Sequence, residues 1–157
     1  MESAFDFISV TDKPALLALT TPAWQEAARA ALTKLGYKIQ EAATHADFIS
    51  NFSQVSYELA VIEEHFASDA SQQNQSLVYL QTIPMSQRRH CTVVLAGDSF
   101  TTLHSMQAFQ QSVHLVVNPS EISLLTQIIQ KGVAENDLFL QPYRQAQRRQ
   151  IGAATGD

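Results

Sequence analysis

One stretch decides the fold of this chain: Tyr57-Glu-Leu-Ala-Val-Ile-Glu63. Its centre, Leu59 to Ile62, is a continuous apolar run of strand length. A run without polar alternation is typical of a strand that is buried on both faces of a parallel sheet. The run ends in the carboxylate of Glu63. The stretch therefore predicts an internal strand of an α/β sheet that carries an acidic residue to the end of the strand.

Similar apolar runs occur on both sides of this stretch and alternate with amphipathic helical patterns. We predict strands over 14–20, 37–43, 58–62, 92–96 and 113–117. The second of these is more polar and is expected nearer the sheet edge. We predict helices that begin after Thr21-Pro22 and at Thr44, and further helices over 77–83, 101–111 and about 120–133. This order corresponds to five consecutive βα units.

The helical segments differ in how their apolar residues are placed. In the segment 101–111, Leu103, Met106 and Phe109 recur at a spacing of three and are predicted to face the core. The segment 67–76 is rich in Ser, Gln, Asn and Asp and is expected to be an exposed loop.

Length and composition set the broad class. The 157 residues suit one domain, 45% of them are hydrophobic, and no apolar run approaches the ~18 residues that span a bilayer. The N-terminus lacks the basic start and apolar core of a signal peptide, and the single cysteine, Cys91, excludes an internal disulfide. We therefore expect a cytoplasmic protein. The formal net charge of −5 argues against a general nucleic-acid binder.

Three local patterns, in this order, resemble the CheY-like receiver domain of bacterial response regulators. Leu35-Gly36-Tyr37 followed by Glu41-Ala42 is similar to the junction into the family's second strand. The stretch that ends in Glu63 resembles its third strand, and Val116-Val117-Asn118-Pro119 resembles the end of its fifth. The resemblance covers residues 14–133. It implies a flavodoxin-like (βα)5 fold, a doubly wound parallel sheet of five strands, preceded by an N-terminal extension, residues 1–13.

The resemblance also implies where a phosphorylation site would lie. In the family, an aspartate at the position of Glu63 accepts the phosphoryl group, and an acidic pair after the first strand holds Mg²⁺. Here Thr20 and Thr21 replace that pair. The family's hydroxyl residue corresponds to Ala96 or Gly97, and its lysine corresponds to Asn118. The family's lysine–proline peptide is usually cis, and we expect the same of Asn118–Pro119.

Loss of these groups removes what phosphoryl transfer requires. The attack of a carboxylate on phosphorus gathers negative charge, which Mg²⁺ and its carboxylate ligands have to neutralise. We therefore predict no phosphotransfer, no bound metal and no cofactor. Two interpretations of Glu63 stay open: a built-in mimic of the phosphorylated state, or a drifted, solvated residue at a loop edge. The family's aromatic switch position corresponds to His114 or Leu115, neither of which is Tyr or Phe.

The chain continues past a minimal receiver. Residues 134–150 are predicted to be a helical extension, in which Pro142 kinks the helix or starts a new one. This extension either forms a dimer contact or docking element or packs back on its own domain. The surface in question comprises Leu138, Phe139, Tyr143, Arg144 and Arg148. The arginines either contact phosphates or an acidic partner or are solvated. Residues 151–157, rich in Gly and Ala, are expected to be disordered.

Two functional hypotheses follow. The first is a non-phosphorylatable, receiver-like module of bacterial signal transduction that acts by binding a protein partner or a second copy of itself. The second is a domain that binds a nucleotide or metabolite at the carboxyl ends of its strands, in a pocket lined by Thr20, Thr21, Glu63, Gly97, Ser99 and Asn118. An enzyme is disfavoured, because no phosphate loop, nucleophile–base pair or paired metal-ligand spacing is found.

Overall fold

The computed structural model describes residues 12–67 and 73–155, and within this part the side chains of residues 143, 144, 147, 148, 150 and 151–155 are not described. Five parallel strands form one sheet in the order β2-β1-β3-β4-β5. This order confirms the predicted flavodoxin-like topology. The strands are β1 (Pro14–Ala18), β2 (Lys38–Glu41), β3 (Leu59–Glu63), β4 (Thr92–Ala96) and β5 (Leu115–Val117).

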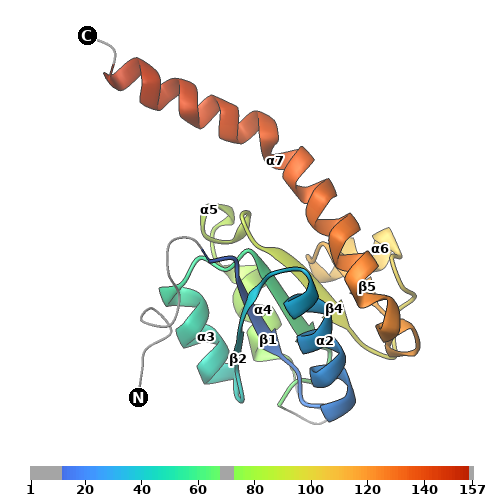
Figure 1. The fold of residues 1–157 in the computed structure, drawn as a ribbon. Helices are drawn as coiled ribbons and strands as arrows, with labels where there is room; N and C mark the ends of the chain where they lie inside the picture. The colour runs from blue at the N-terminus through green and yellow to red at the C-terminus, as the bar shows by residue number, and fades with distance from the viewer. Residues whose placement is uncertain (1–11, 68–72, 156–157) are drawn as a thin grey trace.

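Helices cover both faces of the sheet (Figure 1). One face packs against α2 (Pro22–Lys34) and the first part of α7 (Leu125–Thr155). The other face packs against α3 (His45–Gln54), α4 (Gln75–Thr82) and α6 (Ser105–Gln111). The short helix α5 (Met85–Arg88) precedes β4, and the 3₁₀ segment η1 (Pro119–Leu124) leads into α7.

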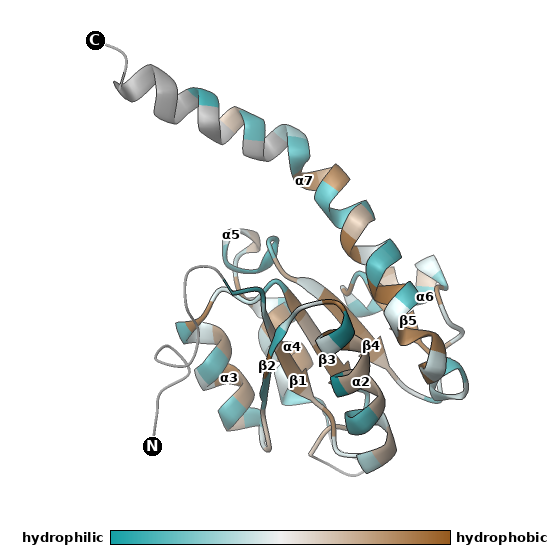
Figure 2. Cartoon of the chain, in the orientation of Figure 1, coloured by the Kyte–Doolittle hydropathy of each residue, from teal (hydrophilic) through white to brown (hydrophobic). Residues whose placement is uncertain are grey.

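The three central strands are buried along their whole length, as the apolar runs predicted. Their side chains alternate between two separate cores. Leu16, Ala60 and Ile62 pack toward α3 and α4, whereas Leu17, Leu59 and Val61 pack toward α2 and α7. Figure 2 shows the apolar strands enclosed between helices whose outer faces are polar. No helix in the described part of the chain is long and apolar enough to cross a membrane.

The edge position and the helix starts agree with the sequence. The more polar strand β2 lies at the edge of the sheet. Thr44 caps α3 by accepting a hydrogen bond from the Asp47 amide at 3.1 Å, and the Asp47 carboxylate accepts one from the Ala43 amide at 3.3 Å, one residue before the N-cap amide that a capping box uses. Thr21 precedes α2, but its side chain makes no capping bond.

The prediction for the segment 101–111 is wrong in two respects. The helix α6 begins only at Ser105, because residues 101–104 form turns, and Leu103 adopts a positive φ of 63°. Its stripe of apolar residues also faces outward. Met106 and Phe109 are 57% and 79% exposed, and Ala108 is the buried residue of this helix.

The C-terminal region is one helix rather than an extension followed by a disordered tail. The helix α7 runs from Leu125 through Pro142 to Thr155, so residues 151–155 are helical and no break separates 133 from 134. Its first part packs on the sheet closely enough that a Cβ on Gly132 would lie 2.2 Å from a methyl carbon of Leu115. Its last part projects away from the domain (Figure 1).

Candidate functional site

Strand β3 brings Glu63 to the carboxyl edge of the sheet, next to the end of β1. The residue is only 5% exposed. One carboxylate oxygen accepts a hydrogen bond from the Thr20 amide at 3.0 Å. The other accepts from the Thr21 amide at 3.3 Å and from the Thr21 hydroxyl at 2.5 Å. The interpretation of Glu63 as a solvated residue is therefore wrong, and the bond to Glu63 also explains why Thr21 makes no side-chain cap on α2.

The two threonines act as hydrogen-bond donors where a working receiver has metal ligands. The Thr20 hydroxyl also accepts from the Ala67 amide at 2.9 Å. Thr20 thus connects the loop after β1 with the loop after β3, and both loops close around Glu63. A buried carboxylate needs such donors, since burying it without partners costs several kcal/mol.

A second set of polar residues, which the sequence analysis missed, lies behind Glu63. Asn74 is 8% exposed, and its amide donates to the backbone oxygens of Glu63 and Glu64 at 3.0 and 3.1 Å. Its side-chain oxygen accepts from the Leu77 amide and caps α4. The fully buried Ser76 donates from its amide to Nδ1 of His45 at 3.1 Å. Asn74 and Ser76 are therefore not part of an exposed loop as we expected, whereas residues 68–72 of the predicted loop lie outside the described residues. An asparagine just before an apolar helical run is the sequence signal for this cap.

Gly97 and Asn118 occupy the neighbouring strand ends. The Glu64 side chain lies across Gly97, where a Cβ would come within 2.2 Å of its Oε2. The Asn118 amide donates to the Phe100 carbonyl at 2.9 Å, and its oxygen accepts from the Ser120 amide at 3.0 Å. Asn118 therefore stabilises the loops that follow β4 and β5. The described peptides include no cis bond, so the expectation for Asn118–Pro119 is wrong.

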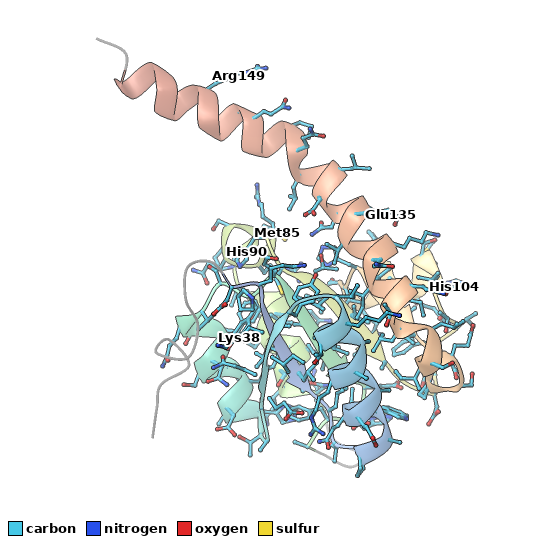
Figure 3. The ribbon with its side chains drawn as sticks, in the orientation of Figure 1. Lys38, Met85, His90, His104, Glu135 and Arg149 are labelled. Carbon is cyan, nitrogen blue, oxygen red and sulfur yellow. The ribbon has the colours of Figure 1, made fainter. Side chains whose placement is uncertain are left out.

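Hollows in the surface lie at the opposite, amino-terminal edge of the sheet. A cavity of about 460 Å³ lies between α5, α6 and the residues before β5. A second, of about 260 Å³, continues it between α5, β5 and α7. We call the two together the amino-edge groove, and its principal lining residues are Met85, Arg88, Arg89, Phe109, His114 and Phe139. Figure 3 shows Met85 beside α5 and Glu135 on α7, two residues that line the second cavity.

Some of the exposed apolar side chains lie at this groove. The large hydrophobic residues that are exposed in the described part of the chain all lie on α5, on α6 and the turn before it, on η1 or on α7. They are Met85, Leu103, Met106, Phe109, Leu124, Leu138 and Phe139. Of these residues, Met85, Phe109 and Phe139 line the amino-edge groove, and exposed apolar side chains that lie together are typical of an interaction surface. The predicted surface residues Leu138 and Phe139 are among the exposed residues, whereas the side chains of Tyr143, Arg144 and Arg148 lie outside the described residues.

A buried polar network fastens α7 to the sheet inside the groove. The Asn136 amide donates to the Thr92 hydroxyl at 3.1 Å, and Nδ1 of His114 accepts from the Val93 amide at 2.9 Å. Burial and the nearby charge of Arg88 lower the pKa of His114, and a hydrogen bond with Asn136 opposes them. The imidazole is therefore held in its neutral form, because a protonated Nδ1 cannot accept the Val93 hydrogen bond.

Known structures match this fold, although no protein-family model and no curated protein matches the sequence. A CheY-like response regulator receiver domain protein from Methanospirillum hungatei has a TM-score of 0.61 at 14% identity, over 81% of this chain and 98% of that one. HP1043, an orphan response regulator of H. pylori, has a TM-score of 0.57 at 16% identity, over 76% and 95%.

A third match extends further along the chain. It is a fusion of amino acids 181–211 of the trimeric coiled coil of yeast Spc42 to another solved structure. Its TM-score is 0.61 at 17% identity, over 94% of this chain and 97% of that one. At that coverage the match includes most of α7. Taken together, the comparisons show that this chain has the CheY-like receiver fold.

Removing the Glu63 carboxylate is expected to destabilise the domain. Glu63→Ala removes the acceptor of three part-buried hydrogen bonds from Thr20 and Thr21, so we expect a loss of about 1–3 kcal/mol in the free energy of unfolding. Glu63→Gln keeps one good acceptor and should lose about half as much. Urea unfolding measures both. The control is Glu58→Gln at an exposed position, which should change stability by less than about 0.5 kcal/mol. Equal effects of the three variants would contradict the role of the carboxylate.

The free energy of unfolding is expected to decrease at acidic pH because of His114. Its folded-state pKa lies below the usual 6.5, so below that pH the unfolded state binds more protons. The free energy of unfolding should therefore be level above about pH 6.5 and should decrease as the pH falls below it. In His114→Asn, whose side-chain oxygen can accept the Val93 hydrogen bond, this decrease should be smaller. Burial also lowers the pKa of His45, so His45→Asn measures the other contribution. Identical pH profiles for wild type and His114→Asn would contradict the prediction.

Proposed function

We propose that this protein is a receiver-like module of bacterial signal transduction that is not phosphorylated and that acts by protein–protein interaction, including self-association. The receiver fold supports a role in signal transduction. The observation that carries the proposal is the bonding of Glu63, because its carboxylate is already engaged by Thr20 and Thr21.

Three features of the carboxyl edge argue against phosphotransfer. A nucleophile has to reach phosphorus with a free oxygen, whereas both oxygens of Glu63 accept hydrogen bonds in a nearly buried position. The positions that would hold Mg²⁺ are Thr20 and Thr21, which offer donors and no carboxylate. The Asn118 amide, at the position of the family's lysine, bonds to Phe100 and Ser120 instead.

The same bonds suggest what Glu63 does instead. Its side chain reaches from β3 to the loop after β1 and holds that loop without any added ligand. Glu63 is thus a fixed charge that closes the site permanently. A small-ligand site at this edge is the weaker alternative, because Thr20, Thr21 and Glu63 already bond to one another.

The interaction surface that we propose is the exposed apolar part of the amino-edge groove, with Met85 on α5, Phe109 on α6 and Phe139 on α7. Phe109 and Phe139 are 79% and 81% exposed, and aromatic side chains are typical anchors of protein interfaces. The match to a structure that carries a trimeric coiled coil supports self-association through α7. In this proposal the domain presents a constant surface that no phosphorylation alters.

Phosphate mimicry tests the first part of the proposal. Titration with Mg²⁺ and beryllium fluoride is expected to leave the amide signals of Thr20, Thr21, Glu63 and Gly97 unchanged, because the acceptor is occupied and no carboxylate pair binds the metal. Two-dimensional NMR measures these shifts. The variant Glu63→Asp is the matched control: it restores the family's acceptor but not its metal ligands, and should also stay unchanged. Saturable shifts around position 63 in the wild type would contradict the proposal.

Substitution of the two exposed rings tests the second part. Phe139→Ser and Phe109→Ser are each expected to weaken self-association at least tenfold, about 1.4 kcal/mol, because each removes a large apolar side chain from the contact. Analytical ultracentrifugation over a range of concentrations measures the dissociation constants. Urea unfolding serves as the control, since exposed positions should change stability by less than about 0.5 kcal/mol. A wild type that stays monomeric throughout, or variants that associate equally well, would contradict self-association through this surface.

A further inference from the structure

The amino-edge groove combines apolar walls with two arginines, Arg88 and Arg89, and one carboxylate, Glu135. Met85, Phe109 and Phe139 present exposed apolar surface along its length. Arg88 lies among them and donates to the Ser112 carbonyl at 3.2 Å. Within the described part of the chain, no ion pair to a carboxylate is found for Arg88. Such a groove fits a segment that is both apolar and acidic, since a carboxylate would complete the environment of the guanidinium.

One segment of this chain has that chemistry. Residues 1–11 precede β1 and read Met-Glu-Ser-Ala-Phe-Asp-Phe-Ile-Ser-Val-Thr. They include Phe5, Phe7 and Ile8, two acidic residues, Glu2 and Asp6, and no basic residue. We propose that this N-terminal segment docks in the amino-edge groove of its own domain, with its aromatic residues against Met85, Phe109 and Phe139 and its carboxylates near Arg88.

The topology places both partners at the same edge of the sheet. The segment enters the fold at Pro14, the first residue of β1, and the groove lies at the amino-terminal ends of β4 and β5. In the order β2-β1-β3-β4-β5, three strand spacings separate β1 from β5, which is about 14 Å. A chain of eleven residues spans up to about 36 Å. The segment is therefore long enough to reach the groove and to lie along it.

Docking in this way gives the segment a regulatory role, a consequence that rests on the proposed function. The groove includes Phe109 and Phe139, the two rings that we assign to self-association. A segment bound over them competes with a second copy or another partner for the same surface.

A spin label tests the docking directly. The variant Ala4→Cys, in the full chain, carries a nitroxide at position 4. The native Cys91 is fully buried, and burial raises the pKa of its thiol, so it stays unlabelled. We expect the label to broaden the amide signals of Ser112, His114 and Glu135, which line the groove. A label at Ser50→Cys, exposed on α3, is the matched control and should leave those three signals sharp.

Charge reversal makes the test specific. Arg88→Glu should reduce the broadening, because it places a carboxylate opposite Glu2 and Asp6. Adding Glu2→Lys and Asp6→Lys to that variant should restore it. Broadening that is absent, or that appears on α3 rather than in the groove, would overturn the proposal. A second sample mixes spin-labelled protein without isotope with isotope-labelled protein without a spin label. If the groove signals broaden in this mixed sample, and do not broaden when label and isotope are in the same monomeric molecule, the occupant of the groove is a second copy and the proposal is overturned.

The experiment separates this proposal from the proposed function. The broadening is measured at a concentration where the protein is monomeric, so it does not depend on self-association. If Phe139→Ser leaves self-association unchanged while the groove signals broaden, the interface assignment fails and the docking stands. If self-association depends on both rings and no broadening occurs, the docking alone fails.

Discussion

The carboxyl edge of this sheet depends on the hydrogen bonds that the Glu63 carboxylate accepts from Thr20 and Thr21. They join the end of β3 to the loop after β1. The Thr20 hydroxyl also accepts a hydrogen bond from the Ala67 amide, which connects the loop after β3 to the same site. A carboxylate with this little exposure needs several donors, and the two loops supply them. The same group cannot at once be tied to the loop and be free to attack phosphorus. In the function that we propose, Glu63 has this structural role and accepts no phosphoryl group.

The two edges of the sheet therefore differ in polarity and in exposed apolar surface. At the carboxyl edge, Asn74 and Asn118 donate to backbone groups of the loops, and Thr20 and Thr21 donate to Glu63. At the amino edge, the cavities and the exposed rings of Phe109 and Phe139 remain. There Asn136 and His114 hold α7 in place through buried hydrogen bonds. The domain thus offers a closed edge where receivers carry out chemistry and an open surface at the other end.

The fold could be predicted from the sequence because each strand is a local pattern. The continuous apolar runs identified β1, β3 and β4, and the order of βα units gave the topology. The positions of Glu63, Thr20 and Thr21 also followed from the strand ends. Their hydrogen bonds did not, because a linear pattern does not show how far a glutamate side chain reaches across a sheet. The role of Asn74 was not predicted for a similar reason. Its neighbours in the sequence are polar, which indicated an exposed loop, whereas the residue is buried and caps α4.

The wrong prediction for Leu103, Met106 and Phe109 has a physical explanation. A spacing of three shows that residues share a helix face, but it does not show whether that face meets the same domain. The helix α6 is seven residues long and begins after a turn, so Ala108 rather than Phe109 meets the core. An exposed phenylalanine is unfavourable in water unless something covers it. Of the three residues, Phe109 lines the amino-edge groove, and it is there that we propose contacts with the N-terminal segment and with a partner.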